Sequence, residues 1–363
     1  MPLLHYYPWA YHGATAMNTR RCIALYSGGL DSILSVKMIE DQGLDVVPIR
    51  FYSPFFGFEI IQDPQAYRQY HENAYGINVH LIDFTHDIIE IIKNPRHGYG
   101  KHLNPCIDCK IGMLKKAKGL LETYNASFVI TGEILGQRPM SQRRESMNSI
   151  VRESGLKDIL LRPLCARKLK ETLPERMGFV DREALGCITG RGRKDQIMLA
   201  VKYGINKETI PTPAGGCLLT DEQISLKVKN TFERFHPAMP GKEDLILDIV
   251  GRKFCLDEST VLVVSRSEEE NGILSTLISP GNIFVKIADV PGPLSIVRGN
   301  PTKDNMLKAA AICMRYGKGR GLNGQMALYG PDPYNFADCI ESPVVTEEYC
   351  VTFQLDLNKG ISL

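Results

Sequence analysis

Between residues 21 and 163, short apolar runs alternate with longer segments in which apolar residues recur every three to four positions. The short runs predict β-strands and the longer ones predict amphipathic helices. The expected strands are 22–26, 46–52, 79–84, 128–131 and 159–161, and the expected helices are 33–42, 64–75, 107–124 and 141–153. This alternation predicts an α/β fold with a doubly wound, mostly parallel sheet.

After Pro163 the pattern changes to short basic helices, expected at 168–176, 181–187 and 194–203, followed by a helix from Thr220 toward Phe235. The glycine- and proline-containing stretch 237–241 predicts a linker. Beyond it, strands at 260–265, 283–287 and 294–297 and helices at 268–277 and 305–315 predict a smaller α+β domain. The expected division is a disordered tail at 1–18, a parallel α/β domain at 19–165, a basic helical extension at 166–236 and the α+β domain at 242–363.

Composition adds few constraints. The 363 residues are 44% hydrophobic and 23% charged with a formal net charge of +2, which is typical of a globular protein, so any nucleic-acid surface must be local. Ten cysteines spread along the chain do not resemble a secreted disulfide framework and favour the reducing cytoplasm. No apolar run reaches the roughly 18 residues that span a bilayer, so no membrane partner is expected.

The stretch from Ser27 to Ser32, Ser-Gly-Gly-Leu-Asp-Ser, joins an expected strand to an expected helix. Two glycines let a diphosphate approach the main chain, and the first N–H groups of the helix can bind it. Ser27 and Ser32 add hydroxyl donors, and Asp31 adds a carboxylate for Mg²⁺. No Gly-Lys-Ser/Thr sequence ends the loop, so it is not a Walker A motif. A glycine-rich turn without a ligand is the alternative.

A pair of cysteines, Cys106 and Cys109, lies where a loop is expected to become a helix. Their sulfurs can converge on one atom, and the helix start is expected to lower their pKa toward the thiolate. A redox dithiol, half a zinc site, ligands of an iron–sulfur cluster and unconnected thiols all stay open. Cys217, after Gly215-Gly216, is a third candidate thiolate. Further cysteines are expected to be small core residues: Cys22, Cys165, Cys187, Cys255 and Cys313.

The loop resembles that of the PP-loop ATPases, and with the cysteines it makes residues 20–225 resemble the PP-loop tRNA thiolation enzymes, including the 4-thiouridine synthetases and 2-thiouridylases. The matching motifs are Ser27–Ser32, Asn104-Pro105-Cys106-x-x-Cys109-Lys110, Thr131-Gly132-Glu133, Gly136-Gln137-Arg138-Pro139, Leu161-Arg162-Pro163-Leu164 and Pro213-x-Gly215-Gly216-Cys217. The resemblance implies an adenine nucleotide alpha hydrolase-like fold and adenylation of a uridine oxygen that sulfur then replaces.

The same resemblance implies the site residues. ATP with Mg²⁺ is expected at Ser27, Gly28, Gly29, Asp31, Ser32, Arg50, Phe51, Thr131, Gly132 and Gln137. Asp31, Cys106 and Cys217 are the expected catalytic residues, and Cys106, Cys109 and Cys217 are the expected ligands of a 4Fe-4S cluster, with persulfide chemistry as the alternative. The sulfur donor is expected to be sulfide or a cysteine desulfurase.

The C-terminal third resembles the NFACT-type RNA-binding domain of the ribosome-quality-control and fibronectin-binding family. The resemblance lies in Asn282–Pro293, in the helix that contains Lys308-Ala309-Ala310-Ala311, and in Tyr316–Arg320. Because Glu268–Glu270 opposes the few basic residues of this part, an altered RNA role stays open. Basic residues expected to contact RNA phosphates, with a solvated helical surface as the alternative, lie in the extension: Arg162, Arg167, Lys168, Arg191, Arg193 and Lys194.

These observations predict a cytoplasmic, ATP-dependent tRNA sulfurtransferase that releases AMP and pyrophosphate, with a homodimer as the expected assembly. One alternative is a PP-loop enzyme that adenylates or thiolates a small molecule or a carrier protein. The other is a non-catalytic RNA-binding or Fe–S-sensing protein.

Overall fold

The computed structural model describes residues 19–212, 216–236 and 238–355. Residue contacts divide the chain into two compact units, each described here by itself. Unit 1 comprises Met1–Phe51, Asp63–Phe84 and Cys106–Gly215, and unit 2 comprises Tyr52–Gln62, Thr85–Pro105 and Gly216–Leu363. The tail expected at 1–18 lies outside the described residues. The predicted domain boundaries stay predictions.

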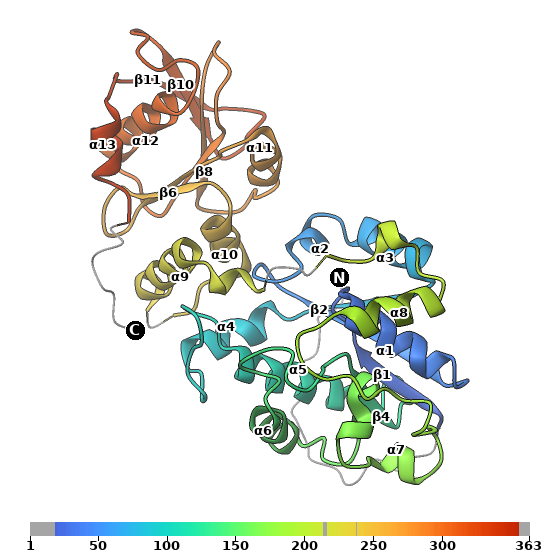
Figure 1. Cartoon of the computed structure of the whole chain (residues 1–363). Helices are drawn as coiled ribbons and strands as arrows, with labels where there is room; N and C mark the ends of the chain where they lie inside the picture. Colours follow the sequence, from blue (N-terminus) through green and yellow to red (C-terminus); the bar gives the residue numbers. More distant parts are fainter. Residues whose placement is uncertain (1–18, 213–215, 237, 356–363) are drawn as a thin grey trace. The chain divides into compact units, whose positions relative to one another are not determined.

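Unit 1 is built on a five-stranded sheet in the order β3-β2-β1-β4-β5. The strands are β1 (Arg21–Leu25), β2 (Asp45–Tyr52), β3 (His80–Asp83), β4 (Phe128–Thr131) and β5 (Leu160–Leu161). The central strand β1 pairs in parallel with β2 on one side and β4 on the other, and β4 pairs in parallel with β5. The predicted parallel α/β sheet is therefore confirmed (Figure 1).

Helices cover this sheet because β1 is apolar on both faces. Cys22, Ala24 and Tyr26 share a core cluster with Ile33 and Leu34 of α1. The helix α5 contacts β1 and packs on α6, as Figure 1 shows. The helices of unit 1 are α1 (Leu30–Glu40), α3 (Pro64–Tyr75), α5 (Cys106–Gly119), α6 (Arg144–Ser154), α7 (Leu173–Arg176) and α8 (Lys194–Lys202), with 3-10 turns η1 (Pro163–Lys168) and η2 (Lys207–Thr209).

The helix expected at 181–187 is wrong, because the backbone there bonds to another segment instead of to itself. The Gly186 N–H donates to Pro163 O at 2.8 Å, the Ile188 N–H donates to Leu164 O at 2.9 Å, and Arg167 N–H donates to Gly186 O at 3.1 Å. This pairing holds the segment against η1. Helical periodicity in a short basic stretch does not reveal such a partner.

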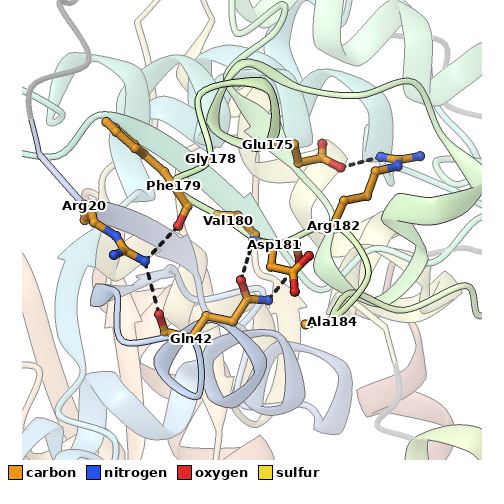
Figure 2. Close-up of a pocket in the computed structure, with 9 residues that line it drawn as sticks. All are labelled: Arg20, Gln42, Glu175, Gly178, Phe179, Val180, Asp181, Arg182 and Ala184. Carbon is orange, nitrogen blue, oxygen red and sulfur yellow. Dashed lines mark hydrogen bonds and ion pairs between the residues drawn. The ribbon is translucent and has the colours of Figure 1, made fainter.

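A cavity of about 590 Å³ lies beside this segment, lined among others by Arg20, Gln42 and Arg182 (Figure 2). The Gln42 amide bonds to both the N–H and the C=O of Asp181, at 2.8 and 3.3 Å. Arg20 donates to Phe179 O at 3.1 Å, and Arg182 pairs with the buried Glu175. Because Arg20 precedes β1 and Gln42 follows α1, the cavity lies at the amino edge of the sheet, opposite the phosphate loop.

Unit 2 contains a six-stranded sheet in the order β11-β10-β8-β9-β7-β6. Its strands are β6 (Arg252–Cys255), β7 (Val261–Val264), β8 (Asn282–Ile287), β9 (Ser295–Arg298), β10 (Met326–Gly330) and β11 (Asp338–Glu341), all joined by antiparallel pairs. Its helices are α2 (Phe58–Gln62), α4 (Thr85–Lys93), α9 (Glu222–Phe235), α10 (Lys242–Ile249), α11 (Glu268–Ser275), α12 (Lys303–Arg315) and α13 (Glu347–Val351), with a 3-10 turn η3 (Leu218–Thr220). The predicted second, α+β domain is confirmed.

Alternate side chains of this sheet enter two cores. Val285 of β8 joins the cluster that contains Ile312 of α12, and the neighbouring Phe284 joins the cluster that contains Ile246 of α10 and Leu274 of α11. Since side chains alternate along a strand, α12 covers one face and α10 and α11 cover the other. No helix of the described ranges is long and apolar enough to cross a membrane.

A buried ion pair ties the helices α9 and α10 to strand β6. Lys253 Nζ lies 2.7 Å from Asp248 Oδ1, with side chains 4% and 0% exposed. Thr231 of α9 donates to the same Asp248 oxygen at 2.9 Å. Removing one partner of such a pair leaves an uncompensated buried charge, whereas replacing both with apolar groups is often tolerated.

We expect Lys253→Met to lower the free energy of unfolding by about 3–5 kcal/mol, and Lys253→Met with Asp248→Leu to restore most of it. Lys308→Met, which breaks a partly exposed pair with Asp304, is the control and should cost about 1 kcal/mol or less. Urea unfolding measures each value. A Lys253→Met loss no larger than the control would show that the buried pair does not hold these elements together.

Candidate active site

The phosphate-loop candidate, residues 27–32, follows β1 and forms the start of α1. Gly28 has φ +76°, the left-handed conformation that glycine adopts without strain. Gly29 is the N-cap of α1, and no side chain caps this helix. Ser32 Oγ donates to Gly29 O at 2.7 Å and lies 3.2 Å from Ser27 Oγ, which ties the loop together. The uncapped first turn can therefore hold an anion, as the sequence predicts.

The end of β4 touches this loop. A Cβ placed on Gly132 would lie 2.6 Å from Asp31 O and 2.6 Å from Ser32 N, so only glycine allows this approach. Gln137 Nε2 donates to Asp31 Oδ2 at 2.9 Å. The structure thus brings together Asp31, Ser32, Thr131, Gly132 and Gln137, which sequence motifs placed in one ATP site. An oriented carboxylate beside a helix N-terminus suits Mg²⁺-bound phosphate.

A buried ion network continues from this point. Arg162 Nε donates to Glu133 Oε2 at 3.0 Å, and Lys110 Nζ lies 3.8 Å from Glu133 Oε1. Burial raises the pKa of Glu133, but Lys110 and Arg162 outweigh burial, so its pKa is lowered and it stays ionised. Because Lys110 follows Cys109 directly, this network connects the end of β4 to the cysteine-bearing helix α5.

Arg162 is 5% exposed and its guanidinium faces Glu133, so burial removes it from the set of RNA-contacting residues. Arg193 is half-buried and donates to Pro211 O at 2.9 Å. Exposed members of the predicted basic set remain: Arg167, Lys168, Arg191 and Lys194.

Cys106 and Cys109 lie one turn apart at the start of α5, on one face of the helix. The expected lowering of the Cys106 pKa is wrong: burial raises it, although Arg138 and Lys110 pull it down. The position at a helix start is visible in the sequence, whereas the enclosure by the folded domain is not. The positive charges of Arg138 and Lys110 favour the thiolate form of Cys106, in opposition to the effect of burial.

Cys217 belongs to unit 2, where it precedes η3; residues 213–215 of its predicted loop lie outside the described residues. Among the described residues, no group of three or more His, Cys, Asp or Glu side chains is placed to hold a metal ion. Three thiolates suit a cluster chemically, and because Cys217 and the Cys106–Cys109 pair belong to different units, the expected 4Fe-4S set stays a prediction. Of the other cysteines, Cys22, Cys165 and Cys313 are buried as expected, and the exposed Cys187 corrects that expectation.

The expected ATP residues on β2 lie beside the loop strand. The Tyr26 N–H donates to Ile49 O at 2.8 Å, which aligns Arg50 with Tyr26. Arg50 Nε is buried and has no hydrogen-bond partner among the described residues. Phe51 is 3% exposed and packs on Phe84, so its main chain, and not its ring, is available to adenine.

Side chains of α3 that sequence motifs missed also contact the loop. A Cβ on Gly28 would lie 2.8 Å from Tyr67 Oη and 3.4 Å from His71 Nε2. Tyr67, His71 and Tyr75 are spaced four residues apart and therefore share one helix face. This spacing is the signal that could have identified them, although spacing alone cannot show which face meets the loop.

Comparisons with known proteins agree with the two motif groups. Residues 18–173 match the family model described as thiamine biosynthesis protein (ThiI), and residues 251–330 match the model described as NFACT protein RNA binding domain. A curated relative from Thermococcus kodakarensis, described as a probable tRNA sulfurtransferase, is 28% identical over 144 residues, which cover 40% of this chain. The match spans 36% of that relative's length.

Two solved structures are similar to parts of the chain. A 4-thiouridine synthetase in complex with RNA and ATP is 20% identical with a TM-score of 0.37, over 55% of this chain and 44% of the other. The U34-tRNA thiolase NcsA from Methanococcus maripaludis, with its [4Fe-4S] cluster, is 16% identical with a TM-score of 0.31, over 63% and 71%. The family matches confirm both resemblances predicted from the motifs: residues 18–173 are similar to the ThiI proteins and residues 251–330 to the NFACT RNA-binding domain.

Proposed function

We propose that the chain is an ATP-dependent tRNA sulfurtransferase that adenylates a uridine carbonyl oxygen and replaces it with sulfur. The observation that carries this proposal is the meeting of Asp31, Gly132 and Gln137 at the phosphate loop. The Glu133 network connects this site to the helix that carries Cys106 and Cys109. Similarity to the ThiI family and to a probable tRNA sulfurtransferase supports the substrate class.

In the first half-reaction the uridine oxygen attacks the α-phosphorus of ATP and pyrophosphate leaves. Ser27, Gly28, Gly29 and Ser32 hold the β- and γ-phosphates, and Asp31 would hold Mg²⁺, which would supply positive charge for the leaving group. The main chain near Arg50, Phe51 and Thr131 holds adenosine. Positioning and charge neutralisation lower the barrier, since the protein forms no covalent bond in this step.

In the second half-reaction a sulfur nucleophile attacks the activated uridine carbon and AMP leaves with the former carbonyl oxygen. Cys106, Cys109 and Cys217 are the proposed sulfur-handling thiols, with sulfide or a cysteine desulfurase as the donor. The 4Fe-4S cluster stays a proposal for iron analysis to test, and no step here depends on it.

The RNA partner is proposed on two grounds: exposed basic residues of the extension, and the similarity of residues 251–330 to an RNA-binding domain. The activity of the whole protein is a proposal, since the match covers 36% of the length of the curated relative. The homodimer and the cytoplasmic location also stay predictions.

Asp31→Asn should reduce tRNA-dependent release of pyrophosphate at least about a hundredfold, because the loop loses its metal-binding charge. Asp41→Asn, at the other end of α1 and exposed, is the matched control and should keep wild-type turnover. Coupled detection of pyrophosphate, with and without tRNA, measures both. Equal activity of Asp31→Asn and wild type would contradict the proposed chemistry, and release that ignores tRNA would favour a small-molecule or carrier-protein substrate.

Arg191→Glu and Lys194→Glu should each weaken tRNA binding and reduce the slope of log affinity against log salt by about one. Lys157→Glu, an exposed lysine of the same unit outside the predicted set, should change neither value. Electrophoretic binding of bulk tRNA at several salt concentrations measures this. A wild type without detectable tRNA binding would refute the tRNA substrate.

Cys106→Ala, Cys109→Ala and Cys217→Ala should each abolish tRNA thiolation but leave pyrophosphate release within about threefold, since activation precedes sulfur transfer. Cys187→Ala, an exposed thiol outside the set, is the control. Anaerobic purification with an absorbance spectrum and iron count tests the cluster directly. A colourless, iron-free, active protein would exclude the cluster, and full thiolation by all three variants would refute the cysteine assignment.

A further inference from the structure

The imidazole of His71 is enclosed by tyrosines at the floor of the phosphate loop. The centroid of its ring lies 4.3 Å from the ring centroid of Tyr67, 5.3 Å from those of Tyr26 and Tyr70, and 5.5 Å from that of Tyr75. His71 is 4% exposed. The helix α3 that carries it is fixed at its start by Asp63, which accepts from the Gln65 and Ala66 N–H groups. The position of this ring relative to the loop is therefore set by packing on several sides.

One ring nitrogen is engaged and the other faces the loop. Tyr26 Oη lies 2.8 Å from His71 Nδ1. His71 Nε2 lies 3.4 Å from the position of a Cβ on Gly28. Among the described residues, neither the Tyr26 hydroxyl nor the His71 imidazole has another hydrogen-bond partner. The Nε2 edge of the ring is thus not engaged by the described residues, and it lies beside the loop proposed to hold phosphates.

A count of the polar groups left unpaired favours one tautomer. If the Tyr26 O–H donates to Nδ1, the neutral ring carries its proton on Nε2, and that N–H is the single donor left without a partner. If Nδ1–H donated instead, the Tyr26 O–H donor and the Nε2 acceptor would both be left without partners, and each would lose the free energy of its hydrogen bonds to water. Burial and the charge of Arg50 lower the pKa of His71 to about 4, so the ring is neutral at neutral pH. Burial also raises the pKa of Tyr26, which keeps its hydroxyl protonated.

We propose that His71 is a phosphate-binding residue of this site: Tyr26 fixes its tautomer, and its Nε2–H donates to an oxygen of the pyrophosphate part of ATP. This inference rests on the proposed function, because it requires ATP at the loop. A neutral donor held in place by the fold binds the phosphate oxygen without rearrangement, and it recognises the leaving group but not AMP. The positive charge of Arg50, whose buried Nε has no hydrogen-bond partner among the described residues, acts on the same ring and lowers its pKa.

Two substitutions of His71 separate the hydrogen bond from the packing. His71→Phe keeps an aromatic ring in the enclosure but removes the N–H, whereas the side-chain amide of His71→Gln can again place an N–H near the Nε2 position. We expect His71→Phe to weaken binding of Mg²⁺-ATP and of pyrophosphate about ten- to a hundredfold, with AMP binding unchanged. His71→Gln should stay within about threefold of wild type for all three ligands.

Tyr26→Phe tests the tautomer, because it removes only the hydroxyl that engages Nδ1. It should weaken pyrophosphate binding about three- to tenfold. Tyr124→Phe is the matched control: its hydroxyl lies 3.5 Å from His80 Nδ1 in another tyrosine–histidine pair of unit 1. That variant should bind pyrophosphate like wild type.

Isothermal titration calorimetry with ATP, pyrophosphate and AMP in the presence of Mg²⁺ measures these affinities, and thermal unfolding checks that each variant is folded. Pyrophosphate binding by a folded His71→Phe at wild-type affinity, or an equal loss for AMP, would overturn the role of His71 while the proposed function stands. A wild type that binds neither ATP nor pyrophosphate would contradict the proposed function and this inference together.

Discussion

The close approach of the Gly132 main chain to the first turn of α1 is the constraint on which the candidate site depends. A single additional carbon at Gly132 would lie 2.6 Å from the Asp31 carbonyl. This contact sets the loop against the end of β4, so that Gln137 reaches the Asp31 carboxylate and orients it. Parallel pairing of β1 with β4 delivers both segments to the same edge of the sheet. Any bulk at Gly132 would therefore separate the parts of the site.

Around this contact the site combines preformed charge with preformed donors. Glu133 stays ionised in the interior because Lys110 and Arg162 compensate its charge. The Lys110–Glu133 ion pair also joins α5 to the segment that follows β4. On the other side of the loop, the α3 tyrosines enclose a neutral histidine. Such an arrangement suits a reaction in which a large anion is held and released and in which the protein makes no bond to it.

Unit 2 has a different structural basis. Its antiparallel sheet is buried on both faces, and the Lys253–Asp248 pair joins its edge strand to α9 and α10. These contacts lie within unit 2 itself, so the packing described for this unit rests on its own sheet and helices.

The sequence by itself determined the parallel sheet, the second α+β domain and the position of the Ser27–Ser32 loop between a strand and a helix, because alternating apolar periods and this motif are local properties of the chain. The resemblance carried by its motifs also grouped Thr131 and Gly132 with Asp31, which the structure brings together. Tertiary structure alone decided that 181–187 is not helical, since its backbone bonds to η1, and that Arg162 is buried against Glu133. It decided too that burial raises the pKa of Cys106 and that His71 faces Gly28. The burial of a side chain and its choice of hydrogen-bond partner depend on segments far apart in sequence, which no local motif marks.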